Sequence, residues 1–333
     1  MTQIIGALPR VTAAERARIL SAPRTPEANA ELMSSIPAMT VLEQGGTPER
    51  DALPRAFTVA AWNVERCLFP AESADHLAQH SPAIVLLSEM DSGMARTAQK
   101  NTSAEMAAAL GMTYAYGVEF YEMGLGGETE RDFCTADFNA AGWHGNAILS
   151  SVPFEKLALI RLDQKGHWFC TGPQSAGDTG QPRLGGRMAV AAIVSADTGP
   201  LCVVSTHLES NAQAPYRHAE FARLLAAVDD FAPGLPVLIG GDLNTGNHMP
   251  PDFDWRKETV FGLAEDQGYS WGLTAEGTTT RASLITPHPT RKMKLDWFAS
   301  RGVTGEALPV LPSVHASGRP LSDHDCMLCR VTL

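Results

Sequence analysis

An apolar run that ends in two glycines and two polar side chains constrains this chain more than any other stretch. Residues 237–241 read VLIGG, and Asp242 and Asn244 follow. A short apolar run bounded by glycine is typical of a buried strand, and the glycines would let the backbone turn and approach a ligand closely. Side chains two residues apart in extended chain point to the same side, so Asp242 and Asn244 aim at one spot. The pair is compatible with a Mg²⁺ or Mn²⁺ site near a phosphate, or with an ordinary Asp/Asn turn.

Segments with strand and helix patterns alternate along the rest of the chain. Strand patterns lie at residues 57–62, 83–87, 114–118, 146–150, 187–195, 201–206, 295–299 and 326–333. Helical patterns lie at residues 72–80, 103–110, 215–231 and 255–267. The glycine-rich segments 121–143 and 163–186 show little periodicity and are expected to be long loops that shape the site. Hairpins mixed with strand–helix units predict an α/β fold with mixed sheets.

The first 52 residues precede the first strong strand. Thr12 and Glu15 form a capping-box pattern that opens a short helix, and Pro26 lies in the first turn of a second one. Residues 44–48 have the composition of a loop. Because this segment holds too little apolar material for a core of its own, we expect residues 1–52 to form an N-terminal helical arm. The arm would pack on a single main domain formed by residues 53–333.

Composition argues against several classes of protein. The chain has 37 acidic and 26 basic residues and a formal net charge of −11, which disfavours a partner bound through phosphate neutralisation. The N-terminus lacks the basic-then-apolar pattern of a signal peptide, and no apolar run approaches membrane-spanning length. Six cysteines in a chain this long do not make a disulfide scaffold. We therefore expect a cytoplasmic protein without a membrane-spanning segment, and its oligomeric state is left open.

Polar residues of similar chemistry occur at five strand ends. They are Asn63 with Glu65, Glu89 with Asp91, His207 with Glu209, Asp242 with Asn244, and Asp323 with His324. A further carboxylate, Asp296, lies inside an otherwise apolar strand. Burying such a group costs several kcal/mol unless it is paired or ligating, so Asp296 needs a partner. The repeated pattern favours a functional site over an isolated turn at Asp242.

Taken in order, these motifs resemble the endonuclease/exonuclease/phosphatase superfamily, which has the DNase I-like fold. The resemblance runs from about residue 56 to the C-terminus and rests on WN at 62–63, SE at 88–89, GNAILS at 145–150, STHL at 205–208, GDLN at 241–244, LD at 295–296 and SDH at 322–324. Each motif is weak alone, and the order makes the set specific. The resemblance implies a four-layer α/β/β/α sandwich of two mixed β-sheets flanked by helices. It also implies cleavage of phosphoester bonds with a divalent metal.

A metal site is part of what the resemblance implies. Glu89 is similar to the family's principal metal ligand, and Asn63 to the neighbour that touches the metal or the phosphate. Asp242 resembles the residue that orients the attacking water or binds a second metal. Asp323 resembles a further contributor to the cluster. The expected cofactor is Mg²⁺, with Mn²⁺ or Ca²⁺ as alternatives.

Two histidines would carry the chemistry. His324 resembles the catalytic histidine, acting as a base or as a charged stabiliser, and Asp296 resembles the carboxylate that orients it. Asn244 resembles the amide that holds the phosphate. A histidine like His207 occurs in branches that include DNase I, sphingomyelinases, inositol-polyphosphate 5-phosphatases and CCR4-type deadenylases. The resemblance therefore predicts the branch with the additional active-site histidine, and the alternative for His207 is a core histidine that caps a strand.

Weaker candidates surround this set. Asn146 follows Gly145 where the family often aims a side chain at the phosphate. Arg183 and Arg187 flank a Gly-Gly pair, and one of them, with Arg187 preferred, could grip a substrate anion, although a solvated surface arginine is the commoner outcome. His144 could reach the same cleft or be structural. For Glu65, the interpretation as a surface charge paired with Arg66 is favoured over a supporting role at the site.

Three functions are compatible with the sequence. We expect a divalent-metal-dependent hydrolase that uses activated water to cleave a phosphoester, preferably a phosphodiester, of a small molecule or lipid headgroup. The alternative is a metal-dependent endo- or exonuclease on DNA or RNA, which the net charge disfavours. The densest basic stretch, residues 291–294, holds only three positive charges. A catalytically silent binding protein on the same scaffold is least favoured, because the set of motif residues looks complete.

Overall fold

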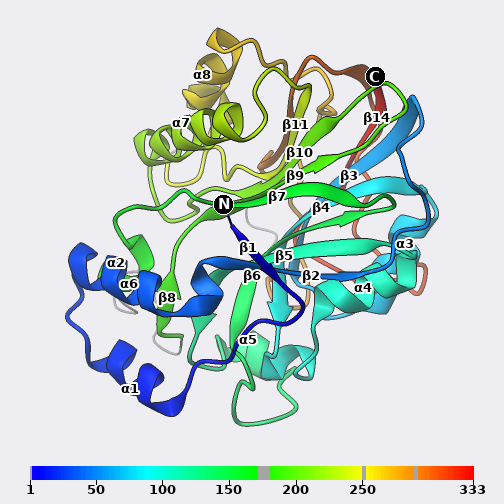
Figure 1. Cartoon of the computed structure of the whole chain (residues 1–333). Helices are drawn as coiled ribbons and strands as arrows, with labels where there is room; N and C mark the ends of the chain where they lie inside the picture. Colours follow the sequence, from blue (N-terminus) through cyan, green and yellow to red (C-terminus); the bar gives the residue numbers. More distant parts are fainter. Residues whose placement is uncertain (1, 172–180, 250–252, 288–291) are drawn as a thin grey trace.

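The computed structural model of the chain describes residues 2–171, 181–249, 253–287 and 292–333. Its described strands form two mixed sheets (Figure 1). The larger sheet contains, in spatial order, β1 (Gln3–Ile5), β2 (Val41–Gly46), β5 (Thr113–Glu122), β6 (Trp143–Ser150), β4 (Pro82–Ser92), β3 (Ala56–Arg66), β14 (Met327–Thr332) and β13 (Thr304–Ala307), with β8 (Arg183–Gly185) paired to β5. The smaller sheet contains β12 (Asp296–Arg301), β11 (Val237–Asp242), β10 (Leu201–His207), β9 (Met188–Val194) and β7 (Phe154–Arg161).

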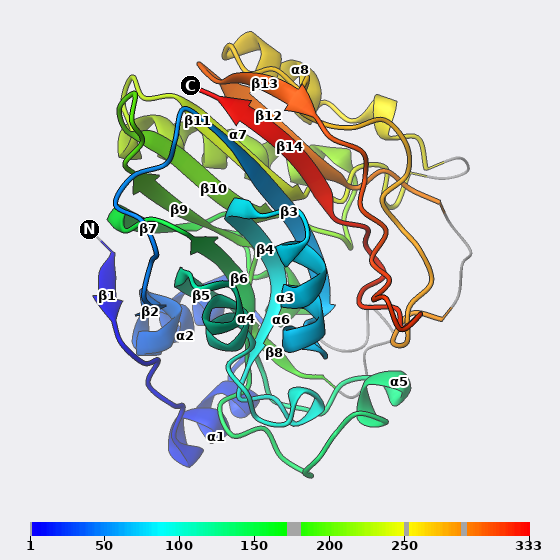
Figure 2. The same ribbon diagram turned by 90° about the vertical axis from the view of Figure 1, so that its right-hand side faces the viewer.

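Helices cover the outer sides of both sheets (Figures 1 and 2). On the side of the larger sheet lie α3 (Pro70–Ala78) and α4 (Thr102–Leu110), and on the side of the smaller sheet lie α7 (Ala214–Phe231) and α8 (Val260–Asp266). Shorter elements are α1 (Ala13–Ser21), α2 (Pro26–Ser35), α5 (Glu128–Arg131), α6 (His167–Thr171) and the 3₁₀ turns η1 (Pro37–Met39), η2 (Ala95–Thr97) and η3 (Trp255–Lys257). In the described part of the chain, no helix combines the length and apolar character needed to cross a membrane. The order helix, sheet, sheet, helix confirms the predicted four-layer sandwich.

Apolar side chains fill the three interfaces between these layers. Alternation along β3 sends Ala61 toward the second sheet and Trp62 toward the outer helices. The interface between the sheets is filled by Val59, Leu86, Ile148, Val190, Val203, Leu238, Phe298 and Met327. The predicted apolar face of α7 packs on the smaller sheet through Phe221, Leu224, Leu225 and Val228. Burying one such side chain contributes about 1.5–3 kcal/mol to the stability of the fold, so each of the three interfaces helps to hold the layers together.

Every strand predicted from the sequence is present in the structure. The structure differs from the prediction in one helix and in elements within the predicted loops. The helix expected at residues 255–267 is divided into η3 and α8. The loop predicted at residues 44–48 is wrong in part, because residues 44–46 complete β2, where two glycines hide the strand pattern. The segments predicted as long loops contain α5, α6 and β8. Residues 172–180 of the second segment lie outside the described residues.

The N-terminal segment joins the larger sheet as well as forming helices. The Thr12–Glu15 capping box is confirmed, with the Glu15 N–H donating to Thr12 Oγ1 at 3.2 Å and the Thr12 N–H donating to Glu15 Oε2 at 2.7 Å. β2 pairs antiparallel with β5, and β1 pairs parallel with β2. Ile19 and Leu32 are buried against the helix-covered side of the larger sheet. The boundary between residues 52 and 53 stays a prediction.

Candidate active site

A cavity of about 260 Å³ is lined by residues from both sheets. Glu89 belongs to β4 of the larger sheet, and His207 and Asp242 are the last residues of β10 and β11. The rest of the wall is formed by Ser210, Asn244, Asn247, Thr280, Arg281, Thr286, Met293, Leu295, Asp323 and His324. The structure therefore brings together the predicted residues Glu89, His207, Asp242, Asn244, Asp323 and His324.

Strand register aligns three site residues across the smaller sheet. His207 lies beside Asp242 in the parallel pair β10–β11, and Asp242 lies beside Asp296 in the antiparallel pair β11–β12. A Cβ on Gly241 would lie 1.9 Å from the carbonyl oxygen of β10 residue Thr206, so glycine is required for this close pairing. The expectation that the glycines turn the backbone toward a ligand is wrong. They lie inside β11, and the left-handed residue after the strand is Asn244, with φ of 50°.

Two irregularities in the larger sheet direct the other side chains. The β3–β4 register shifts between Asn63 and Arg66, and the β4–β6 register shifts between Leu87 and Met90. Glu65, Arg66 and Glu89 at these places have φ of 43°, 72° and 60°. Such a conformation costs a residue other than glycine roughly 1–3 kcal/mol. Bulges re-aim side chains, and here one of them directs Glu89 into the cavity.

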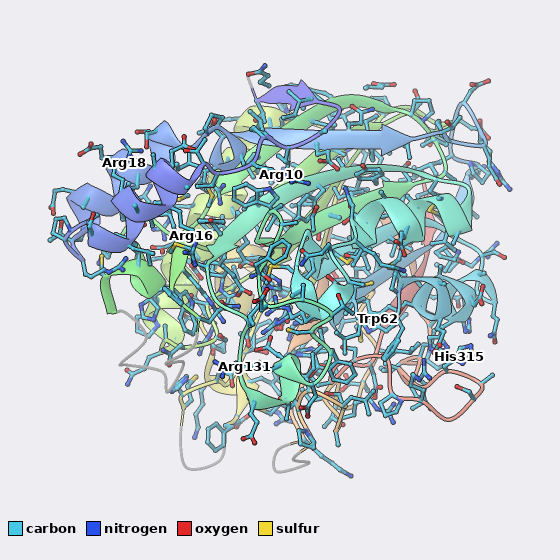
Figure 3. The ribbon with its side chains drawn as sticks, turned by 90° about the horizontal axis from the view of Figure 1, so that it is seen from below. Arg10, Arg16, Arg18, Trp62, Arg131 and His315 are labelled. Atoms are coloured by element: carbon cyan, nitrogen blue, oxygen red, sulfur yellow. The ribbon has the colours of Figure 1, made fainter. Side chains whose placement is uncertain are left out.

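The turn that carries Asp323 and His324 is fastened to β3. Ser322 Oγ donates to the Asn63 carbonyl at 2.6 Å and accepts from the His324 N–H at 3.0 Å. The indole Nε1 of Trp62, labelled in Figure 3, donates to the His324 carbonyl at 2.9 Å. The first strand motif and the last turn, which are far apart in the sequence, are thus in direct contact.

Asn63 connects two of the predicted metal ligands. Its Nδ2 donates to Glu89 Oε1 and to Asp242 Oδ2, both at 3.1 Å. Its Oδ1 accepts from the Glu65 N–H at 3.0 Å. The Asn63 amide therefore holds the two carboxylates at one place. Direct ligation of a metal by Asn63 stays a prediction.

Charge in the cluster is unevenly compensated. Burial raises the pKa of Asp323 to about 6, and the negative charge of Glu89 adds to this effect while His324 opposes it. Burial also opposes ionisation of Glu89, but Arg66 and His207 hold its pKa well below the usual range. No arginine or lysine in the described part of the chain forms a salt bridge with Asp242 or Asp323. Negative charge is thus concentrated at these two residues.

Glu65 is not the surface charge that was expected. It is buried, and its Oε1 accepts from Ser283 Oγ at 2.6 Å. Burial and the nearby Asp323 raise its pKa to about 8. Arg66 instead forms salt bridges with Glu89 and, at 2.8 Å, with Glu130. Glu65 and Arg66 lie at the bulge that ends β3, and their side chains have different partners.

This set of donors fits a hard divalent cation. Carboxylate oxygens are the ligands that Mg²⁺, Mn²⁺ and Ca²⁺ prefer, and Glu89, Asp242 and Asp323 all line the cavity. Asp242, Asp296 and His324 place one possible ligand atom each within 4.8 Å of one another. Burial and repulsion by Glu89 raise the pKa of Asp323, and a cation bound beside it would offset both effects. The identity of the metal stays a prediction.

Both histidines face the same carboxylate oxygen. The Nε2 atoms of His207 and His324 each lie 3.6 Å from Asp242 Oδ2. His324 Nδ1 lies 2.8 Å from Asp296 Oδ2, which confirms that the buried Asp296 has a partner. Burial lowers the pKa of His324, but Asp296 and Asp242 raise it well above its ordinary value. The Nε2 atoms of the two rings therefore lie close to one oxygen atom at the cavity.

A second carboxylate lies behind His207. Glu119 Oε2 is 3.5 Å from His207 Nδ1, and Glu119 Oε1 accepts from Arg187 Nη1 at 2.8 Å. Burial raises the pKa of Glu119, but Arg187 and His207 hold it at about 2. His207 is thus placed in a charged hydrogen-bond network at the cavity wall. Assignment to the branch with the additional histidine stays a prediction.

Three of the four predicted substrate-binding residues, Asn146, His144 and Arg187, do not line the cavity. Asn146 Nδ2 donates to the Met188 carbonyl at 2.9 Å, and His144 Nδ1 lies 2.9 Å from Asp91 Oδ1. Arg187 is buried rather than solvated and reaches the cavity wall through Ser210 Oγ, at 3.0 Å from Nη2. Their buried partners explain these positions. Direct contact of any of the three with substrate stays a prediction that the geometry does not support.

Several cavity residues were missed from the sequence. Asn247, Thr280, Arg281 and Thr286 follow strands or lie in an aperiodic polar segment, where no motif marks them. Arg66 does not line the cavity but pairs with Glu89, which does, and it lies three residues after the first motif. Proximity to that motif is the one feature that could have drawn attention to it. Within the basic stretch at 291–294, Arg291 lies outside the described residues.

Comparison with known proteins places the chain in a family. A search of curated proteins by sequence found no match. Among solved structures, the human nocturnin catalytic domain with bound sulfate is 16% identical, with coverage of 87% of this chain and 96% of that one and a TM-score of 0.52. D. rerio TDP2 humanized by 14 mutations is 17% identical, with coverage of 84% and 100% and a TM-score of 0.52. Mannosyl-6-phosphatase from Bacteroides thetaiotaomicron is 14% identical, with coverage of 83% and 100% and a TM-score of 0.53.

These identities support the shared fold, and the family model supports membership. The model described as Endonuclease/Exonuclease/phosphatase family matches residues 60–324, which include every motif from Trp62 to His324. The match spans most of the chain and both sheets. The protein therefore belongs to the endonuclease/exonuclease/phosphatase family.

Proposed function

We propose that this protein is a divalent-metal-dependent hydrolase that cleaves a phosphoester, preferably a phosphodiester, of a small molecule or lipid headgroup with activated water. The observation that carries the proposal is the meeting of Glu89, Asp242 and Asp323 with the Nε2 atoms of His207 and His324 at one cavity. Phosphoryl transfer depends mainly on positioning and on charge neutralisation. A divalent cation bound by the three carboxylates would supply Lewis-acid neutralisation of the phosphate.

The histidines suit proton transfer on the two sides of the reacting phosphate. His324 is oriented by Asp296, and His207 is held between Glu119 and Arg187. One ring can take a proton from water while the other serves the leaving oxygen. Asn244 is already engaged, since its Nδ2 donates to the Leu208 carbonyl at 2.9 Å and its Oδ1 accepts from Asn247 Nδ2 at 2.5 Å. Its role in holding the phosphate is part of the proposal.

The size and lining of the cavity support a small polar substrate. Its volume of about 260 Å³ lies below the roughly 300–1,000 Å³ of ordinary small-molecule sites. Met293 and Leu295 are the apolar members of the lining, and the others are polar or charged. A headgroup fits this chemistry better than an acyl chain. The net charge of −11 also favours this proposal over a nucleic-acid substrate.

One observation favours a nuclease as the second candidate. A neighbouring cavity of about 490 Å³ shares Met293 with the first and is lined by Trp255, Arg256, Lys292 and Lys294. Positive side chains beside an aromatic ring suit the backbone and bases of a single strand. However, Arg256 pairs with Asp254 at 3.1 Å, and Lys294 lies 3.7 Å from Glu276, which reduces the positive charge available.

A substrate panel tests the proposal. The purified full chain is assayed with bis-p-nitrophenyl phosphate, p-nitrophenyl phosphate, a sphingomyelin-type lipid, a sugar phosphate and plasmid DNA, each with Mg²⁺, Mn²⁺ or Ca²⁺. His324→Ala, purified in the same way, controls for contaminating phosphoesterases. We expect metal-dependent turnover of a phosphodiester that His324→Ala loses. Equal turnover by both proteins, or no turnover of any substrate, would count against the proposal.

A further inference from the structure

The cavity wall carries a cation that the mechanism above does not use. Among the described residues that line the cavity, Arg281 is the only arginine or lysine. We propose that Arg281 is a substrate-binding residue that grips a non-bridging oxygen of the substrate phosphate, and that Asp325 restrains it by competing for the guanidinium group. This inference rests on the proposed function, because it assumes that the cavity receives a phosphoester anion.

The backbone of Arg281 is fixed to the turn that carries the catalytic histidine. The Arg281 N–H donates to the Asp323 carbonyl at 2.8 Å, and the Asp325 N–H donates to the Thr279 carbonyl at 2.7 Å. Thr280 forms an antiparallel bridge with His324 between these bonds. The pairing that places His324 therefore also places Arg281. The backbone bonds hold Arg281 in the cavity wall beside His324, so its guanidinium can meet a ligand there once it leaves Asp325.

The side chain of Arg281 is only partly engaged. Its Nη1 donates to Asp325 Oδ1 at 2.8 Å, and the same oxygen accepts from the Ser313 N–H at 2.8 Å. Its Nε is buried and has no hydrogen-bond partner among the described residues. The side chain is 26% exposed, so it remains open to a ligand. A buried donor without an acceptor is unfavourable, and the fork of a guanidinium matches the oxygens of a phosphate.

A purely structural role for the Arg281–Asp325 pair makes a different prediction from a binding role. If the pair only fastens two segments together, removal of either charge weakens the fold and affects ligand binding in the same direction. If Asp325 competes with the phosphate, removal of its charge frees the guanidinium. Asp325→Asn is suited to this comparison, because the amide oxygen can still accept from the Ser313 N–H. The two variants should therefore move phosphate affinity in opposite directions.

Calorimetric titration of inorganic phosphate into the full chain, with Mg²⁺ present, measures this directly. We expect Arg281→Met to weaken phosphate binding by about tenfold or more, because a charge-assisted hydrogen bond is lost. Asp325→Asn should strengthen binding several-fold. Arg301→Met is the matched control: its side chain is 25% exposed and pairs with Asp229, but it does not line this cavity. The control should bind phosphate as the wild type does.

Four outcomes would overturn the inference. They are no phosphate binding by the wild type, unchanged affinity in Arg281→Met, equal losses in Arg281→Met and Arg301→Met, and a loss in Asp325→Asn that matches the loss in Arg281→Met. If Arg281→Met does not fold, Arg281→Lys replaces it and should lose part of the affinity, because the charge stays and the fork is lost. Turnover by the wild type with normal phosphate binding by Arg281→Met would refute this inference alone. Phosphate binding through Arg281 without turnover of any substrate would refute the proposed function alone.

Discussion

The carboxylates behind the two histidines should contribute unequally to turnover, and the structure predicts the order. Asp296 Oδ2 lies 2.8 Å from His324 Nδ1, whereas Glu119 Oε2 lies 3.5 Å from His207 Nδ1. Glu119 is also shared with Arg187, while Asp296 faces His324 directly. Asp296→Asn should therefore lower turnover more than Glu119→Gln does. Each substitution keeps the shape of the side chain and removes its charge.

Distance gives a rough magnitude for this difference. At an effective dielectric constant of about 20, opposite unit charges attract by about 6 kcal/mol at the 2.8 Å of the Asp296–His324 pair. At the 3.5 Å of the Glu119–His207 pair they attract by about 5 kcal/mol. A difference of about 1 kcal/mol corresponds to roughly a five- to tenfold change in rate. General acid–base catalysis contributes roughly 10²–10⁴-fold. We therefore expect a loss of roughly 10³-fold for Asp296→Asn and of roughly 10²-fold for Glu119→Gln.

The assay is the turnover number on the phosphodiester identified by the substrate panel, with a poor leaving group so that chemistry limits the rate. His324→Ala and His207→Ala set the scale, because each carboxylate variant should lose no more than the matching histidine variant. Thermal melting of each variant checks that the fold is retained. A folded Glu119→Gln that loses as much turnover as Asp296→Asn would refute the distance argument. Wild-type turnover in His324→Ala would refute the role of the pair altogether.

Three further predictions concern the metal, the fold and the substrate. EDTA should abolish turnover, and full turnover in metal-free buffer would contradict the metal requirement. Glu89→Gln should weaken Mn²⁺ binding by roughly tenfold or more in calorimetry, because a carboxylate ligand is lost. Burial and nearby Glu209 raise the pKa of Glu220 well above its usual range, so the native state keeps a proton that the unfolded state has lost. The free energy of unfolding should therefore fall as the pH rises above the pKa of glutamate in the unfolded state, about 4.3. Glu220→Gln should remove this pH dependence of stability and raise the melting temperature at alkaline pH. Glu258→Gln should lower the melting temperature, because it loses its buried pair with Arg217 at 2.9 Å. Melting temperatures that change in the same direction in both variants would refute the raised pKa of Glu220. Turnover of a small phosphodiester should fall only mildly from low to physiological salt, and efficient nicking of plasmid DNA that is lost steeply with salt would favour the nuclease.

The sequence could predict the parts of the fold that depend on local patterns. The run at 237–241 and the apolar face of α7 are readable because burial on one or both faces leaves a periodic trace. β7 was missed because exposed, partly buried and buried positions follow one another along it without strict alternation. β2 was missed because two of its six residues are glycines and its place in the sheet depends on pairing with β5. Such strands are defined by their neighbours more than by their own residues.

Some residues of the candidate site could likewise be predicted from local sequence patterns, and others could not. Motifs at strand ends are local, so Glu89, Asp242 and His324 could be named before the fold was known. Arg281 could not, because its position depends on a backbone bridge between Thr280 and His324, which are far apart in the sequence. The position of Arg66 depends on the bulge at the end of β3, where its backbone is left-handed. Positions of this kind follow from long-range pairing, which periodicity does not report.

Arg96, which is buried, and Arg66, which is partly buried, explain how a chain this acidic can hold so many carboxylates near one cavity. Arg66 joins Glu89 to Glu130, and Arg96 joins Glu130 to Asp91 and Glu122 at 2.7–2.8 Å. Each of these acidic groups therefore has a cationic partner inside the protein, as a buried carboxylate requires.

Asp242 and Asp323 are the exceptions in this arrangement. Neither forms a salt bridge with an arginine or lysine of the described residues, although the charge of Arg66 acts to lower the pKa of Asp323, and Asn63 supplies Asp242 with only a neutral donor. The compensating charge at the cavity must therefore come largely from a ligand, and a divalent cation shared with Glu89 would supply it. Because Arg66 already pairs with Glu89, the cation and the arginine would divide the charge of that carboxylate. The metal is accordingly expected to depend most on Asp242 and Asp323, so neutralising either should weaken Mn²⁺ binding more than Glu89→Gln does.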